Sequence, residues 1–203
     1  QKRAADTGAQ WALVVTPFYN KPTPTGLYRH YEALLNAANI PVILYNVPGR
    51  TGCDMLPETV AEIAKMEGIV AVKEATADIS RVKTIRDTTS EDFKILSGDD
   101  ATTHAFMAQG GDGVISVTSN LVPKEFTDMV HLTRDGKMDE ALALHNRMAE
   151  IFDVLFVESN PIPIKTALAM KGMMEENFRL PLCEISDNAR SKLEAALKNG
   201  NWL

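Results

Sequence analysis

The sequence predicts an α/β fold with a parallel sheet, followed by an all-helical segment. Five short apolar runs recur along the first 135 or so residues, and helix signals follow each of them. The last third of the chain contains no further run of this kind. Parallel strands are covered by helices on both faces, so they read as continuously apolar runs rather than alternating ones. Continuous runs between helical segments therefore predict a parallel sheet built from β-then-α units.

The expected strands are short and rich in β-branched residues, and each ends near a polar residue or a turn. They cover residues 11–15, 41–46, 69–73, 94–97 and 113–117.

The expected helices show apolar residues at helical spacing or a start signal such as Pro57 at the first helical turn. In the sheet-forming part they cover about 27–38, 57–64, 78–87, a segment after 100, and 123–133. In the last third, a long amphipathic helix over 141–155 precedes two more helices, at about 161–174 and 187–198.

Five β-then-α units are compatible with two architectures. One is a complete doubly wound sheet, and the other is the later part of a (β/α)8 barrel. The absence of an initial Met, and a first segment that resembles the end of a helix, favour a barrel whose N-terminal units are missing. We expect residues 1–136 to form the C-terminal portion of the barrel, with the active site, and residues 137–203 to form a helical domain.

Composition excludes several classes of protein. Apolar residues make up 45% of the 203 residues and charged residues 24%, which is typical of a globular protein with a real core. The net charge of −6 argues against broad nucleic-acid binding, and no apolar run approaches the ~20 residues needed to span a bilayer. Cys53 and Cys183 form no metal-binding or redox motif, and no signal peptide is recognisable. We therefore expect reduced thiols and a cytoplasmic location.

Lys73 gives the sharpest chemical signal. In parallel α/β folds, sites gather at the carboxyl ends of strands, and Lys73 ends the third expected strand. Alternation along that strand places Lys73 on the same face as Ile69 and Ala71, inside a barrel. Burial among apolar groups lowers the pKa of a lysine, and a neutral amine can form a Schiff base. The alternative is a lysine that extends from a strand end into solvent.

Two neighbours of the second strand fit the same chemistry. Tyr45 ends that strand and could relay protons to and from a carbinolamine, although a lone tyrosine can equally be a core residue. Arg50, on the following loop, could hold a substrate carboxylate in a bidentate hydrogen bond, or it could be an ordinary solvated charge.

Metal and dinucleotide sites are not expected. The four histidines lie in expected helices without ligand spacing, and the glycine-rich segment 110–113 precedes a strand instead of following one. We therefore assign no metal and no cofactor.

Six segments together resemble the dihydrodipicolinate synthase family of pyruvate-dependent aldolases. The resemblance covers essentially the whole chain, and its motifs occur in the family's order. The segments are TPFYNKP (16–22), LYNVPGRTG (44–52), VKEAT (72–76), LSGDD (96–100), GGDGVISV (110–117) and NPIPIK (160–165).

The resemblance implies a (β/α)8 TIM barrel, with about five of the eight units present here, and a C-terminal helical domain. Lys73 would form the Schiff base with pyruvate, Tyr45 would relay protons, and Tyr19 would complete the proton relay of a neighbouring subunit. Arg50 would hold the carboxylate of the second substrate, L-aspartate 4-semialdehyde. Gly98 and Ile115 match positions that line the pyruvate pocket, the latter through its backbone.

The implied protein is a Schiff-base lyase of lysine and diaminopimelate synthesis that works as a homodimer or homotetramer. N-acetylneuraminate lyases and 2-keto-3-deoxy sugar acid aldolases share the lysine and the tyrosine, but they generally lack the Gly-Arg-Thr-Gly turn that contains Arg50 here. A second alternative is a paralogue or fragment that binds a 2-oxo acid without turnover. One departure from the family is the absence of its early Gly-Thr-Thr-Gly-Glu segment, which again leads us to expect a missing N-terminal part.

Overall fold

The computed structural model describes residues 1–203, which form two compact units, Gln1–Ile115 and Ser116–Leu203. The boundary that we expect at 136/137 lies between two helices of the second unit, α7 (Pro123–Arg134) and α8 (Met138–Val154), which pack against each other. The division into barrel and helical domain at that point stays a prediction.

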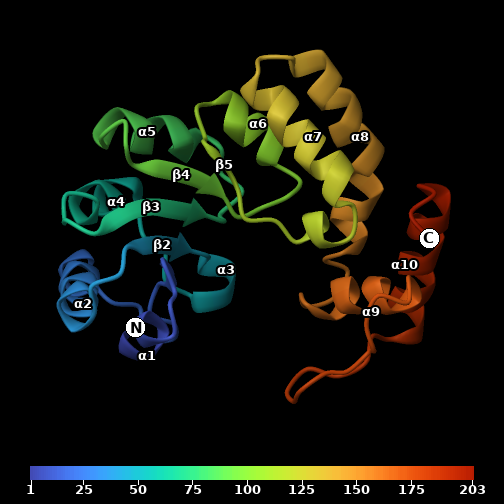
Figure 1. Ribbon diagram of the computed structural model, residues 1–203, viewed down its shortest axis with the longest axis horizontal. Coiled ribbons are helices and arrows are strands. Elements are labelled where there is room, and N and C mark those ends of the chain that lie inside the picture. Colours follow the sequence, from blue (N-terminus) through green and yellow to red (C-terminus); the bar gives the residue numbers. More distant parts are fainter. The chain divides into compact units, whose positions relative to one another are not determined.

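The first unit contains a five-stranded, all-parallel sheet in which the strands follow one another in chain order (Figure 1). The α/β class with parallel strands is thus confirmed. The strands are β1 (Ala12–Val15), β2 (Val42–Asn46), β3 (Ile69–Glu74), β4 (Lys94–Ser97) and β5 (Gly113–Val114).

Helices alternate with these strands. Thr23 caps the first long helix by accepting a hydrogen bond from the Gly26 N–H, and Pro24 occupies its first turn, where a missing N–H costs nothing. The helices of this unit are α1 (Lys2–Asp6), α2 (Pro24–Ala37), α3 (Pro48–Thr51), α4 (Pro57–Ile63), α5 (Ser80–Thr88) and α6 (Thr103–Ala108).

Two elements differ from the sequence prediction. The fifth strand ends at Val114 instead of 117, because the Ile115 N–H makes the last bond to β4 and a 3₁₀ turn, η1 (Thr118–Asn120), soon follows. The segment that follows Val47, read as a turn, forms the short helix α3.

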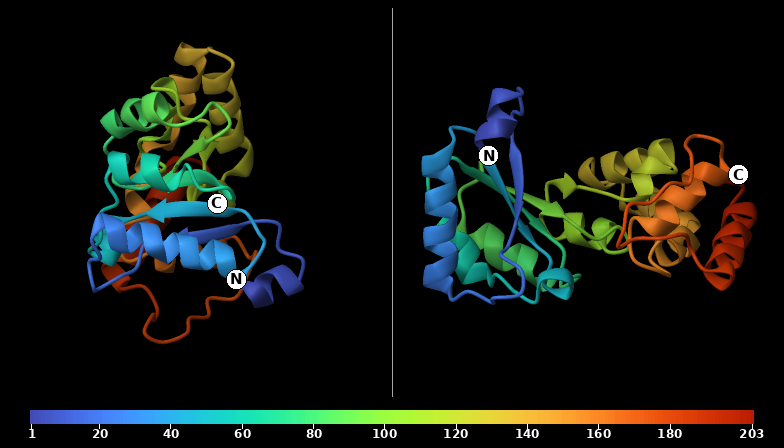
Figure 2. Two further views of the ribbon diagram at one scale, coloured as in Figure 1. Left: turned by 90° about the vertical axis from the view of Figure 1, so that its left-hand side faces the viewer. Right: turned by 90° about the horizontal axis from the view of Figure 1, so that it is seen from below.

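The hydrophobic core of this unit lies between the sheet and its helices. It joins side chains of α2, α4 and α5 to inward-facing residues of the central strands, among them Leu44, Val72 and Ile95. Figure 2 shows α2 running along the sheet on this side. The opposite face of the sheet presents Tyr45 and Lys73, which are only partly buried.

Ile69 departs from the expected alternation. Val42 pairs with Ile69 but Ile43 pairs with Ala71, so that Val70 is an extra residue in β3. This irregularity turns the Ile69 side chain into the helix-side core. Strict alternation from Ile69 through Ala71 to Lys73 is therefore wrong at its first residue, although Lys73 still faces away from that core.

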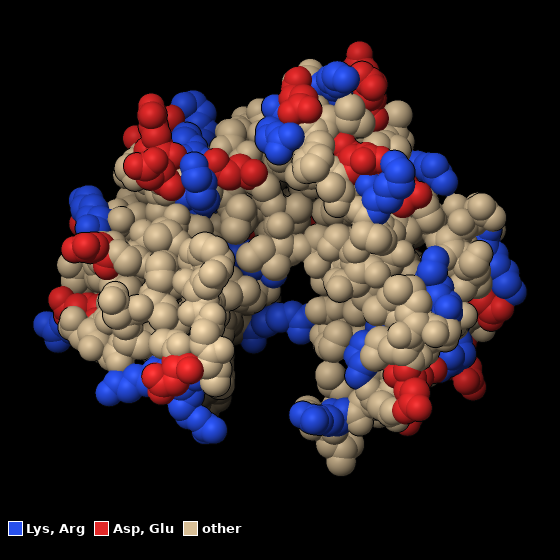
Figure 3. Space-filling model, viewed as in Figure 1, with Lys and Arg blue, Asp and Glu red and all other residues tan.

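The second unit is helical. Its helices are α7, α8, α9 (Ile162–Met170) and α10 (Asp187–Asn199); α7 packs on α8, and α10 contacts both α8 and α9. The face drawn in Figure 3 carries interspersed positive and negative side chains. None of the helices combines the length and apolar character that crossing a membrane requires.

Candidate active site

Lys73 and Tyr45 form the centre of the candidate site. They are partners in the register of β3 and β2, one residue from the carboxyl end of each strand. The Lys73 Nζ lies 4.4 Å from the centre of the Tyr45 ring. The structure thus brings together the two residues that the sequence singled out, at the strand ends where α/β enzymes place their chemistry.

Burial changes the acid–base chemistry of both side chains. Desolvation lowers the pKa of Lys73, and the negative charge of the buried Asp100 partly opposes this effect. Desolvation raises the pKa of Tyr45, while the positive charge of Arg50 acts in the opposite direction. The site therefore favours a neutral amine on Lys73 and a protonated hydroxyl on Tyr45, which suit a nucleophile and a proton donor.

Gly98 lies against the lysine side chain. A Cβ atom at this position would be 2.9 Å from Lys73 Cε and 2.6 Å from the Ala75 Cβ, so a side chain could fit only if the lysine or β3 shifted. The Gly98 N–H donates to the Glu74 carbonyl at 2.7 Å, which fixes the glycine against β3. Ile115 adjoins it through the backbone, since its N–H donates to the Ser97 carbonyl at 3.0 Å.

Arg50 is exposed on α3, the short helix that begins two residues after β2, and its charge acts on Tyr45. Thr51, in the same helix, holds the segment in place. Its hydroxyl accepts a hydrogen bond from the fully buried Thr16 at 3.3 Å and donates to the Cys53 carbonyl at 3.0 Å. The arginine thus lies on a short helix that Thr51 holds in place, and the sequence did not predict this helix.

Tyr19 is connected to this region through its backbone only. Its N–H donates to the Thr51 carbonyl at 3.0 Å, whereas its side chain is 87% exposed. Its φ of +74° is unusual for a residue other than glycine, and such conformations cluster at functional sites. The structure therefore holds the Tyr19 ring out into solvent and does not place it on Lys73 or Tyr45 of the same chain.

Sequence reasoning missed a polar cluster on the helix-facing side of the same strand ends. Asn46 and Glu74 follow Tyr45 and Lys73, respectively, and are almost completely buried. The Asn46 amide donates to Glu74 Oε2 at 3.1 Å and to Asp54 Oδ1 at 3.0 Å, and Arg81 forms a two-pronged ion pair with Asp54. Consecutive polar residues at the ends of two adjacent strands were the available signal.

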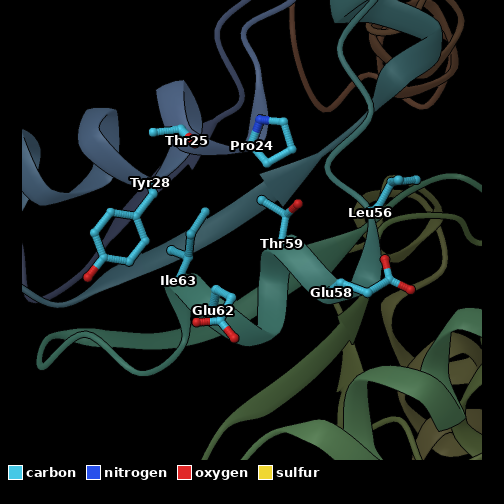
Figure 4. A pocket seen from close by; sticks show the side chains of 8 residues that line it. All are labelled: Pro24, Thr25, Tyr28, Leu56, Glu58, Thr59, Glu62 and Ile63. Carbon is cyan, nitrogen blue, oxygen red and sulfur yellow. The ribbon is translucent and has the colours of Figure 1, made fainter.

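A surface pocket of about 450 Å³ lies between α2 and α4 (Figure 4). It belongs to the helix-covered side of the sheet, and no residue that the sequence analysis proposed for the site lines it. Its lining residues are Pro24, Thr25, Tyr28, Leu56, Glu58, Thr59, Glu62 and Ile63. No group of three or more His, Cys, Asp or Glu side chains is arranged to hold a metal ion.

Comparison with known proteins decides the family. The family model of the dihydrodipicolinate synthetase family matches residues 1–200. The chain belongs to this family. The 4-hydroxy-tetrahydrodipicolinate synthase of Thermodesulfovibrio yellowstonii is 46% identical over 202 residues, which are 100% of this chain and 69% of that protein.

Solved structures of the family have the same fold. Dihydrodipicolinate synthase from Thermotoga maritima superposes with a TM-score of 0.95 at 40% identity, over 99% of this chain and 70% of the other. The chloride-inhibited synthase from Acinetobacter baumannii, crystallised with pyruvate, gives a TM-score of 0.95 at 42% identity, over 98% and 69% of the two chains. The resemblance read from the motifs is confirmed, and so is the partial TIM barrel.

Proposed function

We propose that this chain carries the Schiff-base site of a 4-hydroxy-tetrahydrodipicolinate synthase, which condenses pyruvate with L-aspartate 4-semialdehyde. The protein is a lyase of lysine and diaminopimelate biosynthesis. The observation that carries the proposal is the pairing of a desolvated Lys73 with Tyr45, 4.4 Å from Nζ to ring centre, at adjacent strand ends. Membership of the family supports it.

The first half of the reaction uses Lys73 and Tyr45. The neutral Lys73 amine attacks the keto carbon of pyruvate, and the carbonyl oxygen takes up a proton to give a carbinolamine. The Tyr45 hydroxyl donates the proton with which this oxygen leaves as water, so that the C–N bond becomes the Schiff base. Loss of a methyl proton then gives an enamine whose terminal carbon is nucleophilic.

The second half joins the two substrates. The enamine carbon attacks the aldehyde carbon of the semialdehyde, whose oxygen is protonated to a hydroxyl. The substrate's own amino group then displaces the Lys73 nitrogen and closes the ring, which returns the free amine. Arg50, exposed on α3 beside Tyr45, supplies the donors for the carboxylate of this second substrate.

The exposure of Tyr19 supports the proposal of a homo-oligomer. Its ring is 87% exposed at a backbone φ of +74°, and a residue fixed in this way is suited to reach a site outside its own chain. We propose that it completes the proton relay of a neighbouring subunit in a dimer or tetramer. Both cysteines are free thiols, which is consistent with work in the cytoplasm.

Reduction with borohydride in the presence of pyruvate tests the function. A Schiff base reduced in place becomes a stable secondary amine, which peptide mapping assigns to a residue. We expect the adduct on Lys73, and turnover with the semialdehyde in an assay coupled to the downstream reductase. Absence of an adduct on a folded protein with a complete barrel would overturn the mechanism, whereas an adduct without turnover would indicate a protein that only binds a 2-oxo acid.

A further inference from the structure

The buried polar cluster behind the active site has no part in the chemistry above. Asn46 is fully buried and Glu74 is 3% exposed, and they are register partners on β2 and β3, one residue beyond the pair Tyr45 and Lys73. Successive strand residues point to opposite faces, so the polar pair lies on the helix-facing side and the reactive pair on the other. The two pairs therefore share one stretch of backbone.

The hydrogen bonds of the cluster converge on this stretch. The two amide hydrogens of Asn46 are shared among both Glu74 carboxylate oxygens, Asp54 Oδ1 and the Met55 carbonyl, at 3.0–3.4 Å. The Asn46 oxygen accepts from the Met55 N–H at 3.0 Å, and Glu74 Oε1 accepts from the Thr76 N–H at 2.9 Å.

The backbone of the same residues is linked as well. The Asn46 carbonyl accepts from the Ala75 N–H at 2.9 Å, and the Glu74 carbonyl accepts from Gly98 at 2.7 Å. The hydrogen bonds of Asn46 and Glu74 thus join the ends of β2, β3 and β4.

A role in stability alone explains this arrangement poorly. A buried carboxylate loses its hydration, and an apolar side chain of similar volume usually stabilises such a position at least as well. Burial raises the pKa of Glu74 even though Asn46 and Thr76 donate to it, so the desolvation outweighs those contacts. The nearest Arg81 nitrogen is 3.9 Å away, too far for a direct hydrogen bond. The polar pair fixes the position of β2 relative to β3, because hydrogen bonds restrict the relative placement of two strands more narrowly than apolar packing does.

We infer that Asn46 and Glu74 are positioning residues, whose hydrogen bonds hold the β2–β3 register that places the Tyr45 ring over Lys73. The inference rests on the proposed Schiff-base function for its meaning in catalysis. The placement itself is testable without turnover, because the Lys73 Nζ lies 4.4 Å from the centre of the Tyr45 ring, so that a shift of the ring changes the surroundings of the amine. The charged group that acts on the Lys73 amine is the carboxylate of Asp100, which follows β4.

The test uses Glu74→Gln, which keeps the side-chain length and one acceptor oxygen, and Asn46→Leu, which removes all side-chain hydrogen bonds at that position. The control is Glu67→Gln, the same change at an exposed residue. Competitive labelling with acetic anhydride across a pH series, with mapping of the Lys73 peptide, reports the titration of this amine. Borohydride trapping with pyruvate and the coupled assay report chemistry.

We expect Glu74→Gln to shift the labelling midpoint of Lys73 by about half a pH unit or more. We also expect kcat to fall by about fivefold or more, with a smaller change in the KM for pyruvate, and Glu67→Gln to leave all three unchanged. A folded Glu74→Gln protein with an unchanged midpoint and kcat within about twofold would overturn the inference. The Glu74→Gln variant tests the inference even if the Asn46→Leu protein does not fold. A wild-type protein that forms no adduct, with the midpoint still shifted in Glu74→Gln, would contradict the proposed function and leave the positioning intact.

Discussion

The Nζ atom of Lys73 lies 4.4 Å from the centre of the Tyr45 ring, and the two side chains project from partner positions on adjacent parallel strands. This arrangement has two consequences for the amine. The ring lies over the amine at a distance typical of a cation–π contact, and it holds a hydroxyl group close to any carbonyl that the amine attacks. The ring and the hydroxyl of Tyr45 therefore have separable roles.

Tyr45→Phe separates them. The variant keeps the ring over Lys73 but removes the proton donor, so we expect the titration of Lys73 to change little while kcat falls by about 10²–10⁴-fold. The coupled assay measures the loss, and acetic anhydride labelling measures the titration. The matched control is Tyr28→Phe on α2, at a partly exposed ring. Retention of wild-type kcat by Tyr45→Phe would show that another group supplies the proton.

The pH dependence of Schiff-base formation follows from the direction of the Lys73 shift. In the proposed mechanism the neutral amine is the nucleophile, and a lowered pKa makes it available at a lower pH than in a free lysine. The rate of borohydride-trapped adduct formation should therefore rise with pH and reach half of its plateau at a lower pH than the ordinary pKa of lysine. Measurement of this rate from about pH 6 to pH 11 covers both ranges.

Lys73→Arg is the control for that experiment. Arginine keeps a positive charge and a long side chain but has no nucleophilic amine at these pH values. We expect no trapped adduct, and a loss of turnover of at least about 10³-fold. An adduct that persists in this variant would assign the Schiff base to another lysine.

The sequence predicted the sheet, and the placement of Tyr45 and Lys73 near the ends of neighbouring strands, for one physical reason. Buried parallel strands are continuously apolar, so the sequence shows where β2 and β3 come to an end, one residue after Tyr45 and Lys73, respectively. What it did not reveal depends on contacts between distant segments. The irregularity opposite Val42 reverses the facing of Ile69, and the bonds of Asn46 reach Glu74 and Asp54 across strand and loop. Neither the irregularity nor these hydrogen bonds leave a recognisable pattern in the neighbouring residues of the sequence.

Gly98 provides a steric test of the proposed pyruvate pocket. A methyl group there would lie 2.9 Å from Lys73 Cε, within the range in which one of the two atoms must move. We expect Gly98→Ala to displace the lysine chain and to lower the rate of adduct formation by about tenfold or more. The control is Gly113→Ala on β5, where the added Cβ would meet only Leu96 at an ordinary 3.6 Å. Equal rates in the two variants would exclude a role for the space at Gly98.

Substitution of Arg50 can distinguish recognition of the second substrate from formation of the Schiff base. The guanidinium lies on α3, outside the contact between Lys73 and Tyr45, and its charge acts on Tyr45. A lysine at this position keeps the charge but loses the two-pronged geometry that suits a carboxylate. We expect Arg50→Lys to raise the KM for the semialdehyde by about 10-fold or more, since a hydrogen bond to a charged group contributes about 1.5–3 kcal/mol.

The same variant should trap pyruvate on Lys73 at close to the wild-type rate, because this step precedes binding of the aldehyde. Arg29→Lys, at an exposed arginine of α2, controls for the substitution itself and should change neither quantity. If Arg50→Lys instead slowed trapping and left the KM for the semialdehyde unchanged, the arginine would act through Tyr45 on the first substrate. Its charge already opposes the rise in the tyrosine pKa, so this outcome would assign Arg50 to the proton relay.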